Sequence, residues 1–176
     1  LKKKDYDLAI NFFNSFLKKT NSNKNFHYDA ILRLADSYFA LKAYWPAMDN
    51  YFKIFSNSHE DSDYAFYQTA KSYGFVDRTE KKIKSLENLV NNFEESNLMD
   101  DSLFELALSY SKENNNKKAL ESYDQIIKYY DSSPYRSKAL LNKALILYND
   151  ELLLESYEIL KRLVRAYPNE SLSRQA

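Results

Sequence analysis

The clearest repeating unit of the chain reads ALLNKALILYNDELLLESYEILKRLVRAYPNES and occupies residues 139–171. Its small residue Ala144 is followed by Leu147, and Ser156 is followed by Leu160 and Leu163. Apolar residues that recur at intervals of three and four form one face of an α-helix. The unit therefore predicts two amphipathic helices whose apolar faces pack against each other.

The same pattern occurs three more times toward the N-terminus. Small residues set the register at Ala35, Ala70, Ala107 and Ala144, with spacings of 35, 37 and 37 residues. Sixteen residues after each of them stand Tyr51, Leu86, Tyr123 and Leu160, and nineteen residues after each stand Ile54, Leu89, Ile126 and Leu163. Ala9, Phe13 and Phe16 fit the same register upstream. A helix pair cannot bury its apolar face alone, so repetition of this kind predicts pairs that stack on one another.

Composition supports helices joined by short polar turns. The 176 residues include one Gly and three Pro, and folds rich in tight β-turns need many more of both. Pro46 suits the first turn of a helix, Ser133–Pro134 is expected to begin another, and Tyr167–Pro168 is expected to end one. Asn-rich stretches at 21–25 and 114–116 are predicted to be turns.

These residues resemble the tetratricopeptide repeat, which carries a small residue, an aromatic and a later Pro at comparable offsets. The resemblance implies an all-α fold, a right-handed α-solenoid of antiparallel helix pairs. We expect four units at 28–62, 63–99, 100–136 and 137–170, within one solenoid segment of a longer protein. Residues 1–27 would hold the trailing helix of a preceding repeat, near 4–19, and a further helix would begin near Glu170 and occupy 171–176. Lys82, Thr69 and Lys143 depart from the expected small or apolar residues.

A narrower resemblance concerns the turn YDSSPYRSKA (Tyr130–Ala139) and its echo YPNESLSRQA (Tyr167–Ala176). Both are similar to turns in bacterial cell-envelope proteins, such as the Tol-Pal-associated coiled-coil protein and the outer-membrane assembly lipoprotein. That similarity implies a periplasmic or cell-envelope location, with the cytoplasm as the alternative and with tethering to a membrane through regions outside this segment. The 25 basic and 25 acidic residues balance, so no overall charge favours nucleic acid as a partner.

The sequence offers no assembled set of catalytic, metal-ligating or cofactor-binding residues. His27 and His59 are expected to be exposed turn residues, and the chain has no Cys. The acidic pairs Asp61/Asp63, Glu94/Glu95 and Asp100/Asp101 lie near expected helix ends, where carboxylates cap and complement the helix dipole. With one glycine, a phosphate-binding loop or a nucleophile elbow is excluded. We therefore expect no catalytic residue, no metal and no cofactor in this segment, and a protein that is not an enzyme.

The resemblance places a partner-binding groove along the first helix of each pair. Carried onto this chain, its positions are Asp29, Leu32, Asp36, Phe39, Tyr64, Tyr67, Lys71, Phe75, Asp101, Phe104, Leu108, Lys112, Lys138, Leu141, Leu145, Tyr148 and Asn149. Aromatic and aliphatic residues dominate the set. Lys71, Lys112 and Lys138 could form part of a clamp for an acidic peptide, whereas the three aspartates oppose one. We expect a surface that packs an amphipathic helix or an extended segment of a partner.

Alternatives stay open on the sequence alone. The groove could be covered by neighbouring repeats of the whole protein. The segment could be a cytoplasmic adaptor, or the regulatory or substrate-presenting part of a larger enzyme. Its aromatic residues could instead bind carbohydrate or peptidoglycan. The leading interpretation is a non-catalytic scaffold that binds another protein or peptide, within a bacterial envelope complex.

Overall fold

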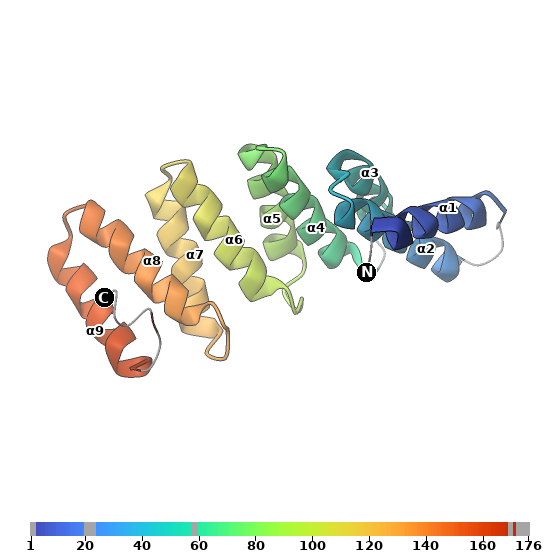
Figure 1. Cartoon of the computed structure of the whole chain (residues 1–176). Helices are drawn as coiled ribbons and strands as arrows, with labels where there is room; N and C mark the ends of the chain where they lie inside the picture. The colour runs from blue at the N-terminus through green and yellow to red at the C-terminus, as the bar shows by residue number, and fades with distance from the viewer. Residues whose placement is uncertain (1–2, 20–23, 58–59, 169–170, 172–176) are drawn as a thin grey trace. The chain divides into compact units, whose positions relative to one another are not determined.

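The computed structural model describes residues 3–19, 24–57, 60–168 and 171, and every extended regular element within these ranges is an α-helix (Figure 1). The helices are α1 (Lys3–Lys19), α2 (Lys24–Ala40), α3 (Tyr44–Phe55), α4 (Ser62–Phe75), α5 (Thr79–Asn92), α6 (Met99–Lys112), α7 (Asn116–Tyr129), α8 (Arg136–Asn149) and α9 (Leu153–Ala166). Among the described residues, no helix combines the length and the apolar character that a membrane span requires.

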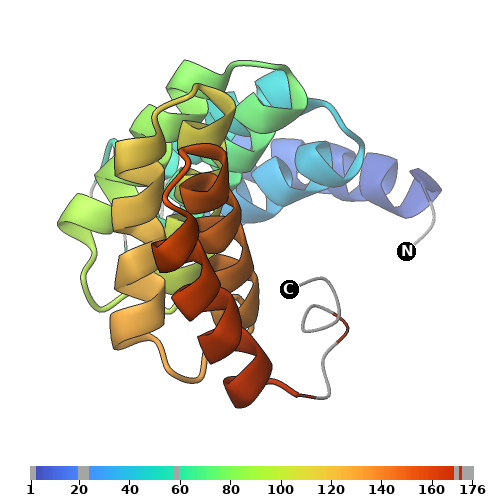
Figure 2. The same ribbon diagram turned by 90° about the vertical axis from the view of Figure 1, so that its left-hand side faces the viewer.

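The helices form antiparallel pairs in two compact units (Figures 1 and 2). In the N-terminal unit, residues 1–98, α1 packs on α2, α2 pairs with α3, α3 packs on α4, and α4 pairs with α5. In the C-terminal unit, residues 99–176, α6 pairs with α7, α7 packs on α8, and α8 pairs with α9. We call α2, α4, α6 and α8 the first helices and α3, α5, α7 and α9 the second helices. The predicted all-α fold of stacked helix pairs is confirmed.

The core follows the repeat register. Ala35, Ala70, Ala107 and Ala144 are fully buried, because two helices approach most closely where a side chain is only a methyl group. The large residues Tyr51, Leu86 and Tyr123 of the second helices are buried as well. Their counterpart in α9, Leu160, is only half-buried.

Each turn between a first and a second helix contains one residue in the left-handed region, and none is glycine. These residues are Lys42, Asp77, Asn114 and Glu151, with φ between 54° and 62°. The backbone N–H of the residue after it donates a hydrogen bond to a carbonyl of the first helix. Ala43, for example, donates to the Tyr38 carbonyl at 2.9 Å. This is the bonding of a Schellman turn, which satisfies carbonyls that the helix end leaves free. The chain therefore makes these tight turns with other residues at a position where glycine is the usual residue.

Lys82 stands where the other pairs carry small residues, and Gly74 makes room for it. A Cβ atom at Gly74 would lie 3.4 Å from Cδ of Lys82, so the lysine stem packs against the bare helix backbone. Lys82 is half-buried there. Lysine can bury its aliphatic stem against a neighbouring helix in this way.

Several local predictions need correction. His27 lies inside α2, not in a turn, because α2 begins at Lys24; His59 lies outside the described residues. α8 begins at Arg136, two residues after Pro134. Asp61 is the N-cap residue of α4 but makes no side-chain capping hydrogen bond. The helix expected near Glu170 falls largely outside the described residues.

Candidate partner-binding surface

Predicted groove residues of the N-terminal unit come together on α2 and α4. We call this the N-terminal surface, and it comprises Asp29, Arg33, Asp36, Phe39, Tyr44, Tyr64, Lys71 and Phe75. Arg33 and Tyr44 were not in the predicted set. Both first helices run in the same direction, so their beginnings meet at one end of the surface and their C-terminal turns meet at the other (Figure 1).

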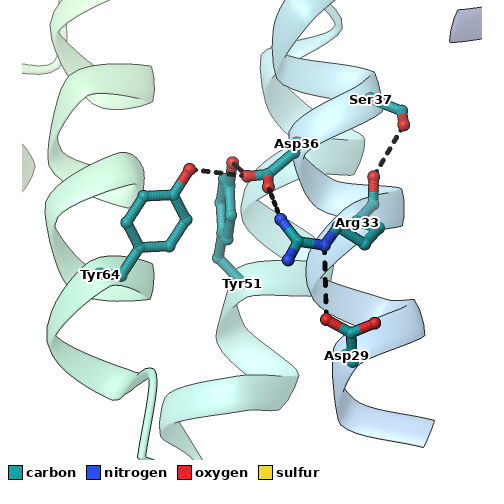
Figure 3. Close-up of polar contacts among 6 residues, drawn as sticks. All are labelled: Asp29, Arg33, Asp36, Ser37, Tyr51 and Tyr64. Carbon is teal, nitrogen blue, oxygen red and sulfur yellow. Dashed lines mark hydrogen bonds and ion pairs between the residues drawn. The ribbon is translucent and has the colours of Figure 1, made fainter. Parts of the chain in front are cut away.

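Between these two ends, one carboxylate receives two tyrosine hydroxyls (Figure 3). The Tyr51 hydroxyl donates to Oδ1 of Asp36 at 2.7 Å, and the Tyr64 hydroxyl donates to the same oxygen at 3.0 Å. Burial, reinforced by the Asp36 carboxylate, raises the pKa of Tyr64 to about 12. The same two causes raise the pKa of Tyr51, whose side chain is fully buried. Both phenols therefore stay protonated and hold Asp36 in place at neutral pH.

Arg33 lies between the two aspartates of α2, as Figure 3 shows. Its Nε is 3.3 Å from Oδ1 of Asp29, and its Nη1 is 3.9 Å from Oδ2 of Asp36. Asp29 lies four residues before Arg33 and Asp36 lies three residues after it, so all three side chains are on one face of the helix. That spacing was visible in the sequence and could have identified Arg33 as part of this surface.

At the end where the C-terminal turns of α2 and α4 meet, three aromatic rings pack together. Tyr44 and Phe75 are stacked, with ring centroids 4.8 Å apart, and Phe39 meets both rings edge to face at 5.6 and 5.9 Å. The Nζ atom of Lys71 lies 5.7 Å from the centre of the Phe39 ring and 5.5 Å from that of Tyr67. Phe75 remains 58% exposed. We call Phe39, Tyr44 and Phe75 the aromatic cluster.

The C-terminal unit carries a comparable surface on α6 and α8, the C-terminal surface. At its centre is Tyr135, just before α8, whose ring stacks on Phe104 with centroids 4.8 Å apart. The Tyr135 hydroxyl donates to Oδ1 of Asp101 at 2.7 Å, and this hydrogen bond, with burial, raises the pKa of Tyr135 to about 12. Nζ of Lys138 lies 5.7 Å from the centre of the same ring. Tyr135 was missed because it lies before the helix to which the predicted positions belong.

Six of the predicted residues of the C-terminal surface are exposed to solvent. They are Leu108, Lys112, Lys138, Leu145, Tyr148 and Asn149. Leu108 and Leu145 follow Phe104 and Leu141 by one helical turn, so they extend the apolar character of α6 and α8 outward. The C-terminal surface thus combines open aliphatic and aromatic area with the polar group around Tyr135.

One predicted position of the groove is not open surface in any of the four pairs. It is occupied by Leu32, Tyr67, Phe104 and Leu141, and all four side chains are buried. Each lies one helical turn before the small residue of its first helix, where the side chain packs into the neighbouring helices. We correct the prediction accordingly: these four residues support the surfaces from beneath.

Comparisons with known proteins agree with this architecture. Residues 101–133 match the sequence model of the tetratricopeptide repeat, and no curated protein gives a significant match. The structure is similar to that of MamA, with 21% identity and a TM-score of 0.74 over 93% of this chain and 89% of that chain. It is also similar to a tetratricopeptide repeat protein from Parabacteroides merdae, with 20% identity and a TM-score of 0.76 over 96% of this chain and 62% of the other.

A third similar structure is that of YrrB, described as a tetratricopeptide-repeat protein with an unusual peptide-binding site. Its identity to this chain is 16% and its TM-score is 0.72, over 98% of this chain and 83% of that one. The chain therefore has the fold of the tetratricopeptide-repeat proteins, and its segment 101–133 matches that family in sequence as well.

Proposed function

We propose that this chain is a scaffold that binds a segment of a partner protein, or a peptide, on the surfaces of its first helices. The observation that carries the proposal is the aromatic cluster, which joins residues of α2, α3 and α4 and leaves Phe75 more than half exposed. Exposed aromatic rings held in fixed positions are typical anchors of protein interfaces, because they bury large apolar area at little conformational cost. The peptide-binding site named for the similar protein YrrB supports the same proposal.

The arrangement favours binding over reaction chemistry. The titratable groups of the two surfaces that have raised pKa values, Tyr64 and Tyr135, donate hydrogen bonds to aspartates and hold them in place. Among the described residues, no group of three His, Asp or Glu side chains could hold a metal ion. We propose that the chain acts by presenting a rigid surface.

The experiment that tests the proposal compares two double variants in affinity capture from the source organism. Tyr44→Ser/Phe75→Ser removes the aromatic cluster, whereas Trp45→Ser/Phe52→Ser removes two aromatics from the outer face of α3. The control is matched, since Trp45 is 53% and Phe52 59% exposed. We expect the first variant to lose captured proteins that the control retains, with both variants folded by circular dichroism. If only the control variant loses captured proteins, the partner binds the outer face of α3, and the proposal is contradicted.

We further propose that the scaffold works in a bacterial envelope complex. The support is the similarity of the Tyr130–Ala139 turn to turns in envelope proteins. Release of the protein from cells by osmotic shock, or its recovery with the membrane fraction, is the expected result. Recovery with a cytoplasmic marker enzyme would reject this location and leave the binding function standing.

A further inference from the structure

Negative charge gathers around Tyr135 on the C-terminal surface. Oδ1 of Asp101 accepts the hydrogen bond of the Tyr135 hydroxyl at 2.7 Å. This hydrogen bond and burial come first among the causes that raise the pKa of Tyr135, and the charges of Asp101, Asp100 and Glu105 add to them. Burial and the charge of Asp100 raise the pKa of Tyr130 as well. The three carboxyl side chains are half-buried, so water and salt screen their charge less than on an open surface.

Positive charge at the same end of the surface is smaller. Nζ of Lys138 lies 5.7 Å from the centre of the Tyr135 ring, and this lysine is exposed. Arg136 forms an ion pair with Asp131 at 2.8 Å, and its Nε donates to the Ile127 carbonyl. Apart from that pair, the side chains described at this end place three carboxylates against one ammonium group. The flexible stem of lysine lets that one charge move away from an arriving cation.

Apolar area lies beside the acidic end, farther along α6 and α8. Leu108 is 39% exposed, Leu145 49% and Tyr148 61%. Lys112 supplies positive charge there, and the turns that follow α6 and α8 carry the acidic residues Glu113, Asp150 and Glu151. The C-terminal surface therefore joins a negatively charged end to an open apolar end.

Resting on the proposed function, we infer that the C-terminal surface binds a segment that carries Arg or Lys close to an apolar residue. The cationic side chain donates charge-assisted hydrogen bonds to the carboxylates of Asp100, Asp101 and Glu105. A carboxylate that already accepts one hydrogen bond keeps lone pairs for further donors, so the Tyr135 hydroxyl need not be displaced. The apolar side chain packs on Leu108 and its neighbours on α8.

The positions of these residues along α6 set the spacing within the bound segment. Leu108 follows Glu105 by three residues and Asp101 by seven, which corresponds to about 5–10 Å along the helix axis. An extended chain advances about 3.3 Å per residue. The basic and the apolar residue of an extended partner segment are therefore expected two or three positions apart.

The test is selection of a random dodecapeptide display library on the immobilised chain, followed by affinity measurements with synthetic peptides. We expect recovered peptides to carry Arg or Lys two or three positions from Leu, Phe, Tyr or Trp. Replacing Arg and Lys by Gln is expected to weaken binding about tenfold or more, the size of one charge-assisted hydrogen bond. Added salt should weaken the binding of the original peptides more than that of the Gln-substituted ones.

Variants of the chain locate the charges. Asp100→Asn/Glu105→Gln keeps the hydrogen bond between Tyr135 and Asp101, and we expect about a tenfold loss of affinity for a basic peptide. The matched control, Glu121→Gln/Glu155→Gln, removes two exposed carboxylates from α7 and α9 and should cause no loss.

Lys138→Met changes the charge in the opposite sense. It removes the ammonium group beside the carboxylates and keeps an apolar stem, so we expect it to bind a basic peptide as tightly as the unchanged chain or more tightly. Weaker binding of basic peptides to Lys138→Met would contradict the inference. Circular dichroism checks that each variant is folded.

The outcomes separate this inference from the proposed function. Neutral or acidic peptides that lose binding with Leu145→Ser/Tyr148→Ser, but bind Asp100→Asn/Glu105→Gln unchanged, would overturn the inference and support the function. Peptides that lose binding only with Tyr44→Ser/Phe75→Ser would do the same. If no peptide is enriched, or if none of the surface variants weakens binding, both the inference and the function are contradicted.

Discussion

Removing the carboxylate of Asp36 is expected to destabilise the N-terminal unit through a side chain on a different helix. Asp36→Ala leaves the hydroxyl of Tyr51 without its acceptor, 2.7 Å away in the intact chain. The Tyr51 side chain is fully buried, so water cannot replace the lost partner. An unsatisfied buried hydroxyl costs about 1–3 kcal/mol, and hydrogen bonds to charged groups lie in the upper part of that range. We expect a loss of about 2 kcal/mol, or roughly 4–8 °C in melting temperature for a chain of this size.

A double-mutant cycle in urea isolates this interaction. Tyr51→Phe alone is expected to cost about 1 kcal/mol, because Asp36 keeps the Tyr64 hydroxyl. The double variant Asp36→Ala/Tyr51→Phe is expected to be more stable than the sum of the single changes by about 1 kcal/mol or more, since each change removes the same contact. Asp49→Ala, at an exposed position of α3, is the control and should change stability little. Additive single changes, or a cost for Asp36→Ala no larger than that of the control, would refute this reasoning.

Three further changes probe other parts of the structure. Glu151→Gly should stabilise the chain by about 0.5–1 kcal/mol, because glycine adopts the left-handed conformation at φ 62° without strain. Glu151→Ala should give no such gain in stability, and urea unfolding measures both variants. Ser102→Ala should stabilise the chain by about 1 kcal/mol, because the buried Ser102 hydroxyl has no hydrogen-bond partner among the described residues and the next pair has Ala139 at the equivalent position. A loss of stability in urea unfolding would contradict this. Alkaline pH should destabilise the fold between pH 10 and about 12: the folded-state pKa values of Tyr64 and Tyr135 are raised, so the stability they contribute is complete below pH 10 and lost as pH rises through 12. Absorbance at 295 nm follows their ionisation, and the double variant Tyr64→Phe/Tyr135→Phe should lose less stability over that range.

The helix pairs could be predicted from the sequence because their cause is local and repeated. Ala35 and its three equivalents mark the close approach of two helices, and apolar residues at intervals of three and four mark each buried face. The position of a wedge residue such as Tyr51 follows from the same register. These features depend on spacing along one chain, which the sequence contains in full.

The turns and polar contacts could not be predicted in the same way. Lys42 and Glu151 adopt a conformation that their residue types disfavour, because the flanking helices impose it. The hydrogen bond between Tyr135 and Asp101 joins residues 34 positions apart, and only packing brings them together. The exposure of Phe75 and the burial of Leu32, both predicted groove residues, likewise depend on neighbouring helices.

The partners of the surface charges were not visible in the sequence. From the sequence, Asp29, Asp36 and Asp101 opposed recognition of an acidic segment. In the structure, tyrosine hydroxyls and Arg33 contact these carboxylates, while Lys71 is held against aromatic rings. The types of charge were visible in the sequence, but their partners were set by the fold.

Site-specific photo-crosslinking in living cells tests the central claim most directly. A photoreactive phenylalanine analogue replaces either Phe75, in the aromatic cluster, or Phe52, on the outer face of α3; the two side chains are 58% and 59% exposed. If the first-helix surfaces bind a partner, irradiation should produce a discrete adduct from position 75 and none from position 52. An adduct from position 52 alone, or none from position 75, would contradict the claim that this chain binds its partner through the surfaces of its first helices.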